Sequence, residues 1–176
     1  MIASHDWIML TAPKTGCTSL YEAIREAQQR AIGRASRVWT VGDGWHNMTI
    51  PARSRKLVYV TVRDPRSRLV SLWQHWRLER GSQSRDTFSK FCQRMASRTL
   101  PWWFQLTLSE WYADVPVCYP VRLERWPQSL PPGMPAPKWQ LNKTVGGQWQ
   151  EWKAEVERFS NLWEADAKRW YPELLR

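Results

Sequence analysis

The sequence lacks any long hydrophobic run, and acidic residues, histidines and cysteines are all few. No stretch of about 18 apolar residues is present, which is the length that a membrane-spanning helix needs. Residues 1–12 also lack the basic start and apolar core of a signal peptide. The sequence therefore predicts a soluble, cytoplasmic protein with no membrane partner.

The three cysteines, Cys17, Cys92 and Cys118, are odd in number and widely spaced. They form no C-x-x-C pair, so they favour neither a disulfide framework nor zinc, and they indicate a reducing compartment. Histidines and carboxylates form no cluster either, and we expect no metal. Cys17 begins a predicted helix, a position that can lower the pKa of a thiol. A cysteine-phosphatase site would need an arginine six residues later, where Ala23 stands.

Basic residues exceed acidic ones by 26 to 16, which gives a net charge of +10 and a pI near 10.0. Such a charge implies an anionic partner: a nucleotide, an acidic or sulfated acceptor, or nucleic acid. The length suits one domain over residues 1–176 with its own core, and neither a repeat nor a clear boundary interrupts it.

The first informative segment is residues 7–20. Residues 8–12 are an apolar run typical of a buried parallel strand, and residues 13–16 end it with a glycine that lets the backbone approach a ligand. A helix is expected from about Thr18, and a helix start at the end of a strand favours an anion. Lys14 adds a charge to this loop, and hydroxyls come from Thr15, Thr18 and Ser19. The alternative is an ordinary strand-to-helix turn, because the G-x-x-x-x-G-K-[ST] signature is absent.

The second segment, residues 57–72, repeats this organisation. Asp64 and Pro65 predict a helix start, with a side-chain cap followed by a proline at the first helical position. Arg63 then lies at the carboxyl end of a strand, where α/β proteins bind ligands, and its guanidinium suits a bidentate contact with phosphate. Ser71, two turns along the helix, can reach the same group. The alternative is that Arg63 pairs with an acid and Ser71 is a packing residue.

Two anion sites in one small domain predict a nucleotide with two separated phosphate groups. Residues 13–20 (PKTGCTSL) and 62–71 (VRDPRSRLVS) together resemble the sulfotransferases that use 3′-phosphoadenosine 5′-phosphosulfate. The resemblance implies an α/β fold in three layers, with a mainly parallel central sheet flanked by helices, in a minimal P-loop-like version. It identifies the first segment with the 5′-phosphosulfate loop and the second with the 3′-phosphate motif. The cofactor-binding residues that it implies are Lys14, Thr15, Gly16, Cys17, Thr18, Ser19, Arg63 and Ser71.

Weaker similarities follow later in the chain. Residues 121–124 (VRLE) resemble a late strand of the family that ends in a glutamate, and residues 141–144 (LNKT) resemble a loop of carbohydrate-type members. The latter adds Lys143 and Thr144 to the cofactor-binding residues. Cys17 departs from the family, which usually has Thr or Ser there, and the chain is short for the family. Golgi members carry a membrane anchor that is missing here, so we expect a bacterial or viral relative unless the chain has been trimmed.

The implied reaction moves a sulfuryl group to a hydroxyl and releases adenosine 3′,5′-bisphosphate without a metal. The expected acceptor is a carbohydrate, with a hydroxylated small molecule as the alternative. Lys14 is expected to neutralise charge on the bridging oxygen, and a base must take the acceptor proton. His46 is the candidate base, because residues 46–49 (HNMT) resemble a segment that precedes the 3′-phosphate motif in carbohydrate-type members. Alternatives for the base are His75, His5, Asp43 and Glu124.

Two other functions compete with a sulfotransferase. A basic, tryptophan-rich module can bind nucleic acid through phosphate contacts and stacking, but no nucleic-acid-binding motif is present and we expect no such partner. A nucleotide kinase would need the Walker lysine and a magnesium carboxylate, which are not evident.

Other segments receive coarser predictions. Residues 36–41 predict a short strand, residues 85–98 an amphipathic helix and residues 115–123 a strand whose prolines suit a sheet edge. Residues 148–170 predict the longest helix, with an aromatic stripe that packs on the core. In the aromatic run of residues 102–104 not every ring can point inward, so this run either lines the acceptor site or covers a sheet edge or dimer contact.

Overall fold

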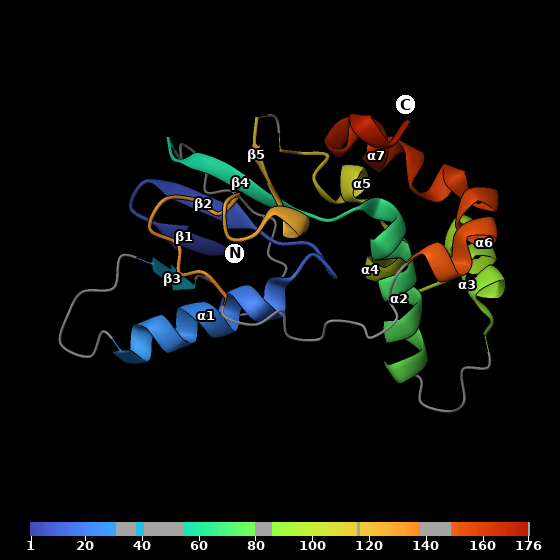
Figure 1. Ribbon diagram of the computed structural model, residues 1–176, viewed down its shortest axis with the longest axis horizontal. Helices are drawn as coiled ribbons and strands as arrows, with labels where there is room; N and C mark the ends of the chain where they lie inside the picture. The colour runs from blue at the N-terminus through green and yellow to red at the C-terminus, as the bar shows by residue number, and fades with distance from the viewer. Residues whose placement is uncertain (31–37, 41–54, 80–85, 116, 138–148, 176) are drawn as a thin grey trace. The chain divides into compact units, whose positions relative to one another are not determined.

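The computed structural model describes residues 1–30, 38–40, 55–79, 86–115, 117–137 and 149–175. Contacts within the chain separate two compact units (Figure 1), the first formed by Met1–Val62 with Asp114–Asn142 and the second by Arg63–Ala113 with Lys143–Arg176. The first unit contains the strands and helix α1, and the second contains helices α2 to α7. That the whole chain forms one domain stays a prediction.

The described strands of the first unit form one sheet in the order β3-β1-β2-β4-β5. Strands β2, β4 and β5 pair in parallel, whereas β1 is antiparallel to both of its neighbours. The bounds are Ile2–Ser4 for β1, Trp7–Leu10 for β2, Val38–Thr40 for β3, Leu57–Val62 for β4 and Tyr119–Arg122 for β5. This is a mixed α/β arrangement, in which the strands of the two informative segments, β2 and β4, are parallel neighbours. The three-layer sulfotransferase form of the fold stays a prediction.

The tight turn between β1 and β2 is held by Ser4. Its Oγ accepts hydrogen bonds from the backbone N–H groups of Asp6 and Trp7, each at 3.2 Å. A serine hydroxyl that bonds to the backbone two or three residues on is a common turn device. It explains why β1 returns antiparallel to β2, an arrangement that the apolar pattern alone did not predict.

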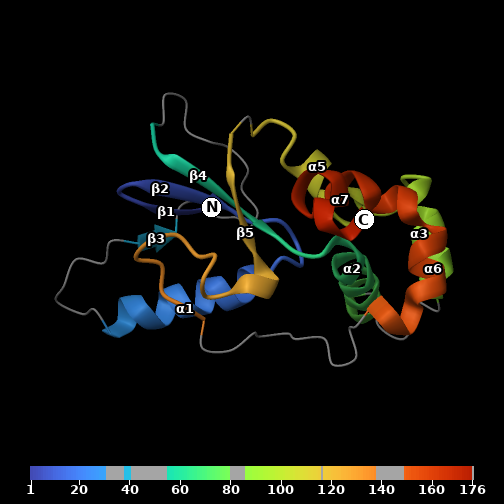
Figure 2. The same cartoon turned by 45° about the horizontal axis from the view of Figure 1, so that its top comes forward.

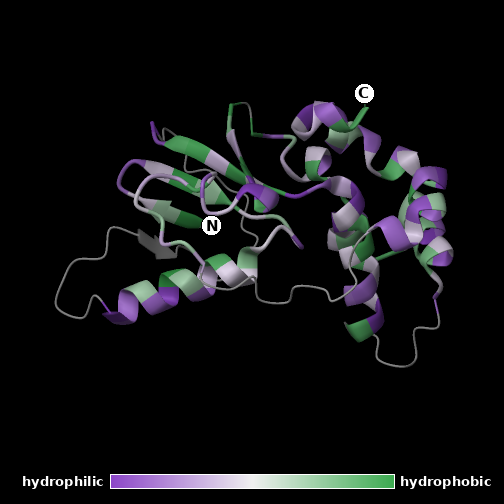
Figure 3. Ribbon diagram, in the orientation of Figure 1, coloured by the Kyte–Doolittle hydropathy of each residue, from purple (hydrophilic) through white to green (hydrophobic). Residues whose placement is uncertain are grey.

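Helix α1 (Cys17–Arg30) covers one face of this sheet, as Figures 1 and 2 show. Leu20 and Ile24 of the helix are buried in a cluster with Trp7 and Met9 of β2. Those helix residues are four apart and those strand residues two apart, the spacings that put side chains on one face of each element. All four residues of β2 are buried, which explains its apolar run. The strands are mostly hydrophobic and α1 becomes polar toward its carboxyl end (Figure 3).

The edges of the sheet agree with the sequence in outline. Strand β5 is an edge strand and contains Pro120, as expected for a proline in a sheet. It is shorter than predicted: it begins at Tyr119, and the 3₁₀ helix η2 (Leu123–Arg125) follows it at once. Residues Val38–Thr40 form the other edge, inside the segment predicted as a short strand.

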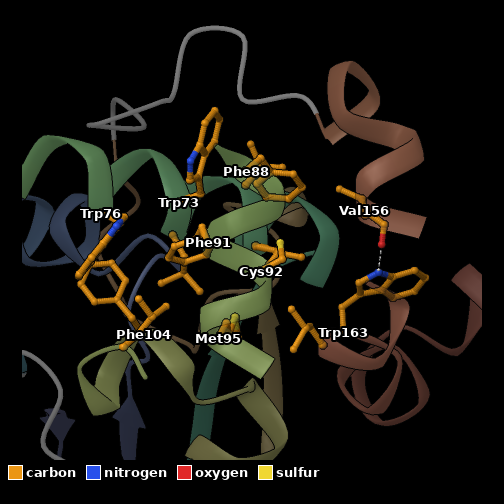
Figure 4. Close-up of a cluster of buried hydrophobic side chains, with 14 of the residues drawn as sticks. Trp73, Trp76, Phe88, Phe91, Cys92, Met95, Phe104, Val156 and Trp163 are labelled. Atoms are coloured by element: carbon orange, nitrogen blue, oxygen red, sulfur yellow. Dashed lines mark hydrogen bonds between the residues drawn. The ribbon is translucent and has the colours of Figure 1, made fainter. Parts of the chain in front are cut away.

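The second unit packs helices around an aromatic core (Figure 4). Helix α3 (Phe88–Ala96) lies within the predicted amphipathic segment, and Thr87 caps it by accepting a hydrogen bond from the N–H of Lys90. The core residues of α3 are Phe88, Phe91, Cys92 and Met95. Burying side chains of this size stabilises a fold by roughly 1.5–3 kcal/mol each. The other elements of the unit are α2 (Pro65–Glu79), α4 (Trp102–Gln105), α5 (Leu108–Trp111), η3 (Trp149–Trp152), α6 (Lys153–Arg158), η4 (Ser160–Leu162), α7 (Glu164–Trp170) and η5 (Pro172–Leu175).

The single long helix predicted near the C-terminus is wrong. Over the part of it that the structure describes, residues 149–170 form four short helical pieces, with non-helical backbone angles at Phe159 and Trp163. The indole N–H of Trp163 donates to the backbone oxygen of Val156 at 2.8 Å (Figure 4). In a continuous helix that oxygen would accept from the N–H of residue 160. The aromatic stripe does pack on the core, but one of its indoles replaces a helical hydrogen bond.

The aromatic run at residues 102–104 divides between core and surface, as predicted. Phe104 is buried, Trp103 is half-buried, and Trp102 remains 61% exposed. The ring of Trp102 stacks on buried Trp111 at 5.3 Å between centroids and 11° between planes.

Candidate functional site

The loop between β2 and α1 has an unusual backbone. Lys14 has a φ of 66° and Gly16 a φ of 89°. Left-handed backbone costs an ordinary L-residue roughly 1–2 kcal/mol, and such residues concentrate at functional sites. Lys14 therefore has a strained backbone three residues before α1 begins, and anion binding by this loop stays a prediction.

Thr15 anchors the loop to the sheet. Its Oγ1 donates to the backbone oxygen of Ala12 at 2.7 Å and lies 2.5 Å from Oγ1 of Thr61. Thr15 and Thr61 are both fully buried. The Thr15 hydroxyl therefore ties the loop to the end of β4, the strand that leads to Arg63. Thr61 gives no functional signal in the sequence beyond being a polar residue in an apolar strand.

Gly16 is required for a second reason besides its φ. A Cβ added there would lie 2.5 Å from Cη2 of Trp126 and 2.9 Å from Cδ1 of Leu123. The sequence predicted that the glycine lets a ligand approach the backbone. That approach stays a prediction; on the side where a Cβ would point, the indole of Trp126 lies close to the backbone.

The first turn of α1 contains the remaining predicted residues of this loop. Cys17 and Ser19 are buried and Thr18 is half-buried. Burial raises the pKa of the Cys17 thiol, although hydrogen bonds from Thr18 and the charge of Lys14 oppose the change. The backbone hydrogen bonds at the helix start do act to lower this pKa, but burial outweighs them. At neutral pH Cys17 is a protonated thiol.

The second loop begins α2 as predicted. Oδ1 of Asp64 accepts from the backbone N–H of Arg66 at 2.9 Å, and the backbone oxygen of Asp64 accepts from the N–H of Arg68 at 2.8 Å. Pro65 is the first helical residue. Asp64 is thus a side-chain cap followed by a proline. This arrangement favours a helix start, because the N–H that proline lacks would have no partner within the helix at that position.

The three arginines at the start of α2 have different environments. Arg66 forms a bidentate pair with Asp64, with Nε and Nη2 at 3.1 and 2.9 Å from its two carboxylate oxygens. Arg68 is buried, with only 3% of its surface exposed. Arg63 is half-buried, and Ser71, eight residues further on, is buried.

The pairing of strands β2 and β4 positions the starts of the two loops. They are parallel neighbours with Leu10 opposite Val60, so both loops begin at the same edge of the sheet. Ligands of α/β proteins bind outside the carboxyl ends of such strands. Arg63 is the residue after β4 and belongs, with Ser71, to the second unit.

Several predicted residues lie outside the described residues: His46, Asp43, Lys143 and Thr144. The other candidate bases are described. The ring of His75 lies 5.7 Å from the ring of Trp103 and 6.0 Å from that of Phe104, while Glu124 is exposed in η2. His5 is exposed, with Nδ1 at 2.8 Å from Oδ1 of Asp6.

Within the ranges that the structure describes, no group of three or more His, Cys, Asp or Glu side chains is arranged to hold a metal ion. No helix in those ranges is long and apolar enough to cross a membrane. Comparisons of the chain with protein-family models, with curated proteins and with solved structures find no match.

Proposed function

We propose that this protein is a sulfotransferase that transfers the sulfuryl group of 3′-phosphoadenosine 5′-phosphosulfate to a hydroxyl, most simply that of a carbohydrate. One observation carries the proposal: two loops with the features of anion sites follow the carboxyl ends of the adjacent parallel strands β2 and β4. The motif resemblance supplies the identity of the nucleotide.

The first loop suits the 5′-phosphosulfate. Lys14 supplies the charge, and α1, which begins at Cys17, presents the N–H groups that a helix leaves unbonded within its first turn. The fit differs from the sequence prediction at two residues. Thr15 uses its hydroxyl to hold the loop, and Cys17, whose thiol pKa is raised by burial, has no hydroxyl to offer the phosphate. Lys14, Thr18 and the helix start are therefore the groups that we assign to this phosphate.

The second loop suits the 3′-phosphate. The motif resemblance assigns the 3′-phosphate to Arg63, which is half-buried and directly follows the carboxyl end of β4. An arginine binds phosphate through two parallel charge-assisted hydrogen bonds, and Ser71 can add a hydroxyl donor.

The reaction is a displacement at sulfur. The acceptor oxygen forms a bond to sulfur as the bond between sulfur and the 5′-phosphate oxygen breaks, and the acceptor proton passes to a base. Lys14 stabilises the negative charge that develops on the 5′-phosphate oxygen. His46 is the base proposed from its motif, and its imidazole would hold the acceptor proton at one ring nitrogen.

The test begins with retention on immobilised adenosine 3′,5′-bisphosphate. We expect the free nucleotide to elute the protein and Lys14→Ala to elute early. Arg30→Ala is the matched control, because Arg30 is an exposed arginine of α1 paired with Glu26 at 2.9 Å, and it should elute like the wild type.

Radiolabelled donor incubated with a panel of hydroxylated sugars should then give a labelled product. A protein that elutes only with salt, and that labels no acceptor, would instead be a general polyanion binder and would overturn the proposal.

A further inference from the structure

Arg68 is a buried arginine whose role the proposed function does not explain. Both of its Nη atoms donate to the backbone oxygen of Leu106, each at 3.1 Å. Leu106 lies between the short helices α4 and α5. A guanidinium with 3% exposure has lost most of its hydration, so it needs both hydrogen bonds and an opposite charge nearby.

Asp166 of α7 supplies that charge. It is 1% exposed, and its carboxylate oxygens accept from the N–H groups of Leu108 and Ser109 at 2.7 and 2.6 Å. Burial lowers the pKa of Arg68 and raises that of Asp166, and each charge opposes the shift of the other. Arg68 therefore holds the carbonyl, and Asp166 the N–H groups, at the start of α5.

The hydrogen bonds of Arg68 to Leu106 fix one particular part of α2. Arg68 is the fourth residue of the helix, and its own N–H makes the first helical bond to Asp64. Arg63 precedes that turn and Ser71 follows it. The positive charge of Arg63 contributes to lowering the pKa of Arg68. The two residues assigned to the 3′-phosphate thus flank the residue that is clamped.

We infer that Arg68 is a positioning residue for the 3′-phosphate: through its two hydrogen bonds to the backbone oxygen of Leu106 it fixes the first two turns of α2, and with them Arg63 and Ser71. The inference rests on the proposed function. Positioning matters because bidentate arginine contacts with phosphate are directional.

The experiment compares two nucleotides that differ only in the 3′-phosphate. Adenosine 3′,5′-bisphosphate and adenosine 5′-phosphate are titrated calorimetrically into the wild type and Arg68→Lys. Lysine keeps the charge but cannot repeat the planar fork, so a change reports geometry rather than charge. We expect the preference for the bisphosphate to fall about tenfold in Arg68→Lys, while affinity for the monophosphate stays unchanged.

Arg94→Lys is the matched control. Arg94 pairs with the buried carboxylate of Asp86 at 2.9 Å in the same unit, from α3. It should lose thermal stability as Arg68→Lys does, yet keep the nucleotide preference. If circular dichroism shows that Arg68→Lys does not fold, Arg68→Gln carries the test, since its amide can still donate to Leu106.

The outcomes separate the two claims. A folded Arg68 variant that keeps the wild-type preference, or an equal loss in Arg94→Lys, overturns the positioning role and leaves the proposed function standing. A wild type that does not distinguish the nucleotides overturns the proposed function and the inference with it.

Discussion

Replacing Gly16 with alanine tests the geometry of the first loop most sharply. The new methyl group would meet Cη2 of Trp126 at 2.5 Å and Cδ1 of Leu123 at 2.9 Å, on a backbone whose φ is 89°. Carbon atoms cannot approach so closely, so the indole, the loop or both must move. Gly16→Ala should therefore destabilise the protein and displace the loop that includes Lys14.

The magnitude has two parts. An L-residue in left-handed backbone costs roughly 1–2 kcal/mol, and forcing extra volume into a packed region costs roughly 1–3 kcal/mol. We expect Gly16→Ala to lower the free energy of unfolding by their sum, roughly 2–5 kcal/mol. Gly133 separates the two parts, because its φ is 75° and a Cβ there would meet nothing within 4 Å. Gly133→Ala should cost only the backbone part, roughly 1–2 kcal/mol.

Urea unfolding followed by circular dichroism measures both losses. A third protein, Gly16→Ala with Trp126→Phe, should recover part of the loss relative to Trp126→Phe alone, because phenylalanine lacks the distal ring atoms that obstruct the methyl group. Equal losses in Gly16→Ala and Gly133→Ala, with no recovery in the double variant, would show that Trp126 does not pack against the loop.

Three further predictions concern charge and catalysis. Lys14→Ala should weaken binding of adenosine 3′,5′-bisphosphate about ten- to hundredfold by calorimetry, because it removes a charge-assisted contact; an unchanged affinity would remove Lys14 from the site. His46→Ala should lower turnover at least about a hundredfold and abolish the acid limb of the rate profile, with nucleotide binding unchanged; a joint loss of binding would make His46 a phosphate contact or a structural residue. Burial tends to raise the pKa of Asp86, but hydrogen bonds from Lys90 and Arg94 outweigh it and hold that pKa below its usual 3.8. The resulting stability is complete above pH 3.8 and is lost as the pH falls through the lowered value. Urea unfolding should show that the free energy of unfolding falls less steeply at acid pH in Asp86→Asn than in the wild type. An identical fall in the two proteins would assign it to other carboxylates.

Local chemistry made the two loops predictable. The apolar runs before them predicted strands, and Asp64 followed by Pro65 predicted a helix start, because a cap and a proline act on their immediate neighbours. These signals lie within a few residues of the structure that they determine. The structure adds that β2 and β4 are parallel neighbours, which places both loops at the same end of the sheet.

Contacts between distant segments were not predictable in this way. Trp126 lies more than a hundred positions from Gly16 in the sequence, and nothing in the pattern around either residue indicates their contact. Asp166 lies within residues 148–170, where the spacing of the aromatic residues predicted a long helix and gave no role to this acid. Its hydrogen-bond partners, the N–H groups of Leu108 and Ser109, come from another helix. The raised pKa of Cys17 likewise depends on burial, which the position of the residue at a helix start does not reveal.

The central claim is that Arg63 and the loop of Lys14 bind the two ends of one nucleotide. Calorimetry of the wild type and Arg63→Ala with adenosine 3′,5′-bisphosphate and adenosine 5′-phosphate tests it most directly. We expect the wild type to prefer the bisphosphate by about ten- to hundredfold, the worth of a charge-assisted contact, and Arg63→Ala to lose most of that preference while binding the monophosphate normally. Equal preference in the two proteins would contradict the assignment of Arg63, and no preference in either would contradict the function itself.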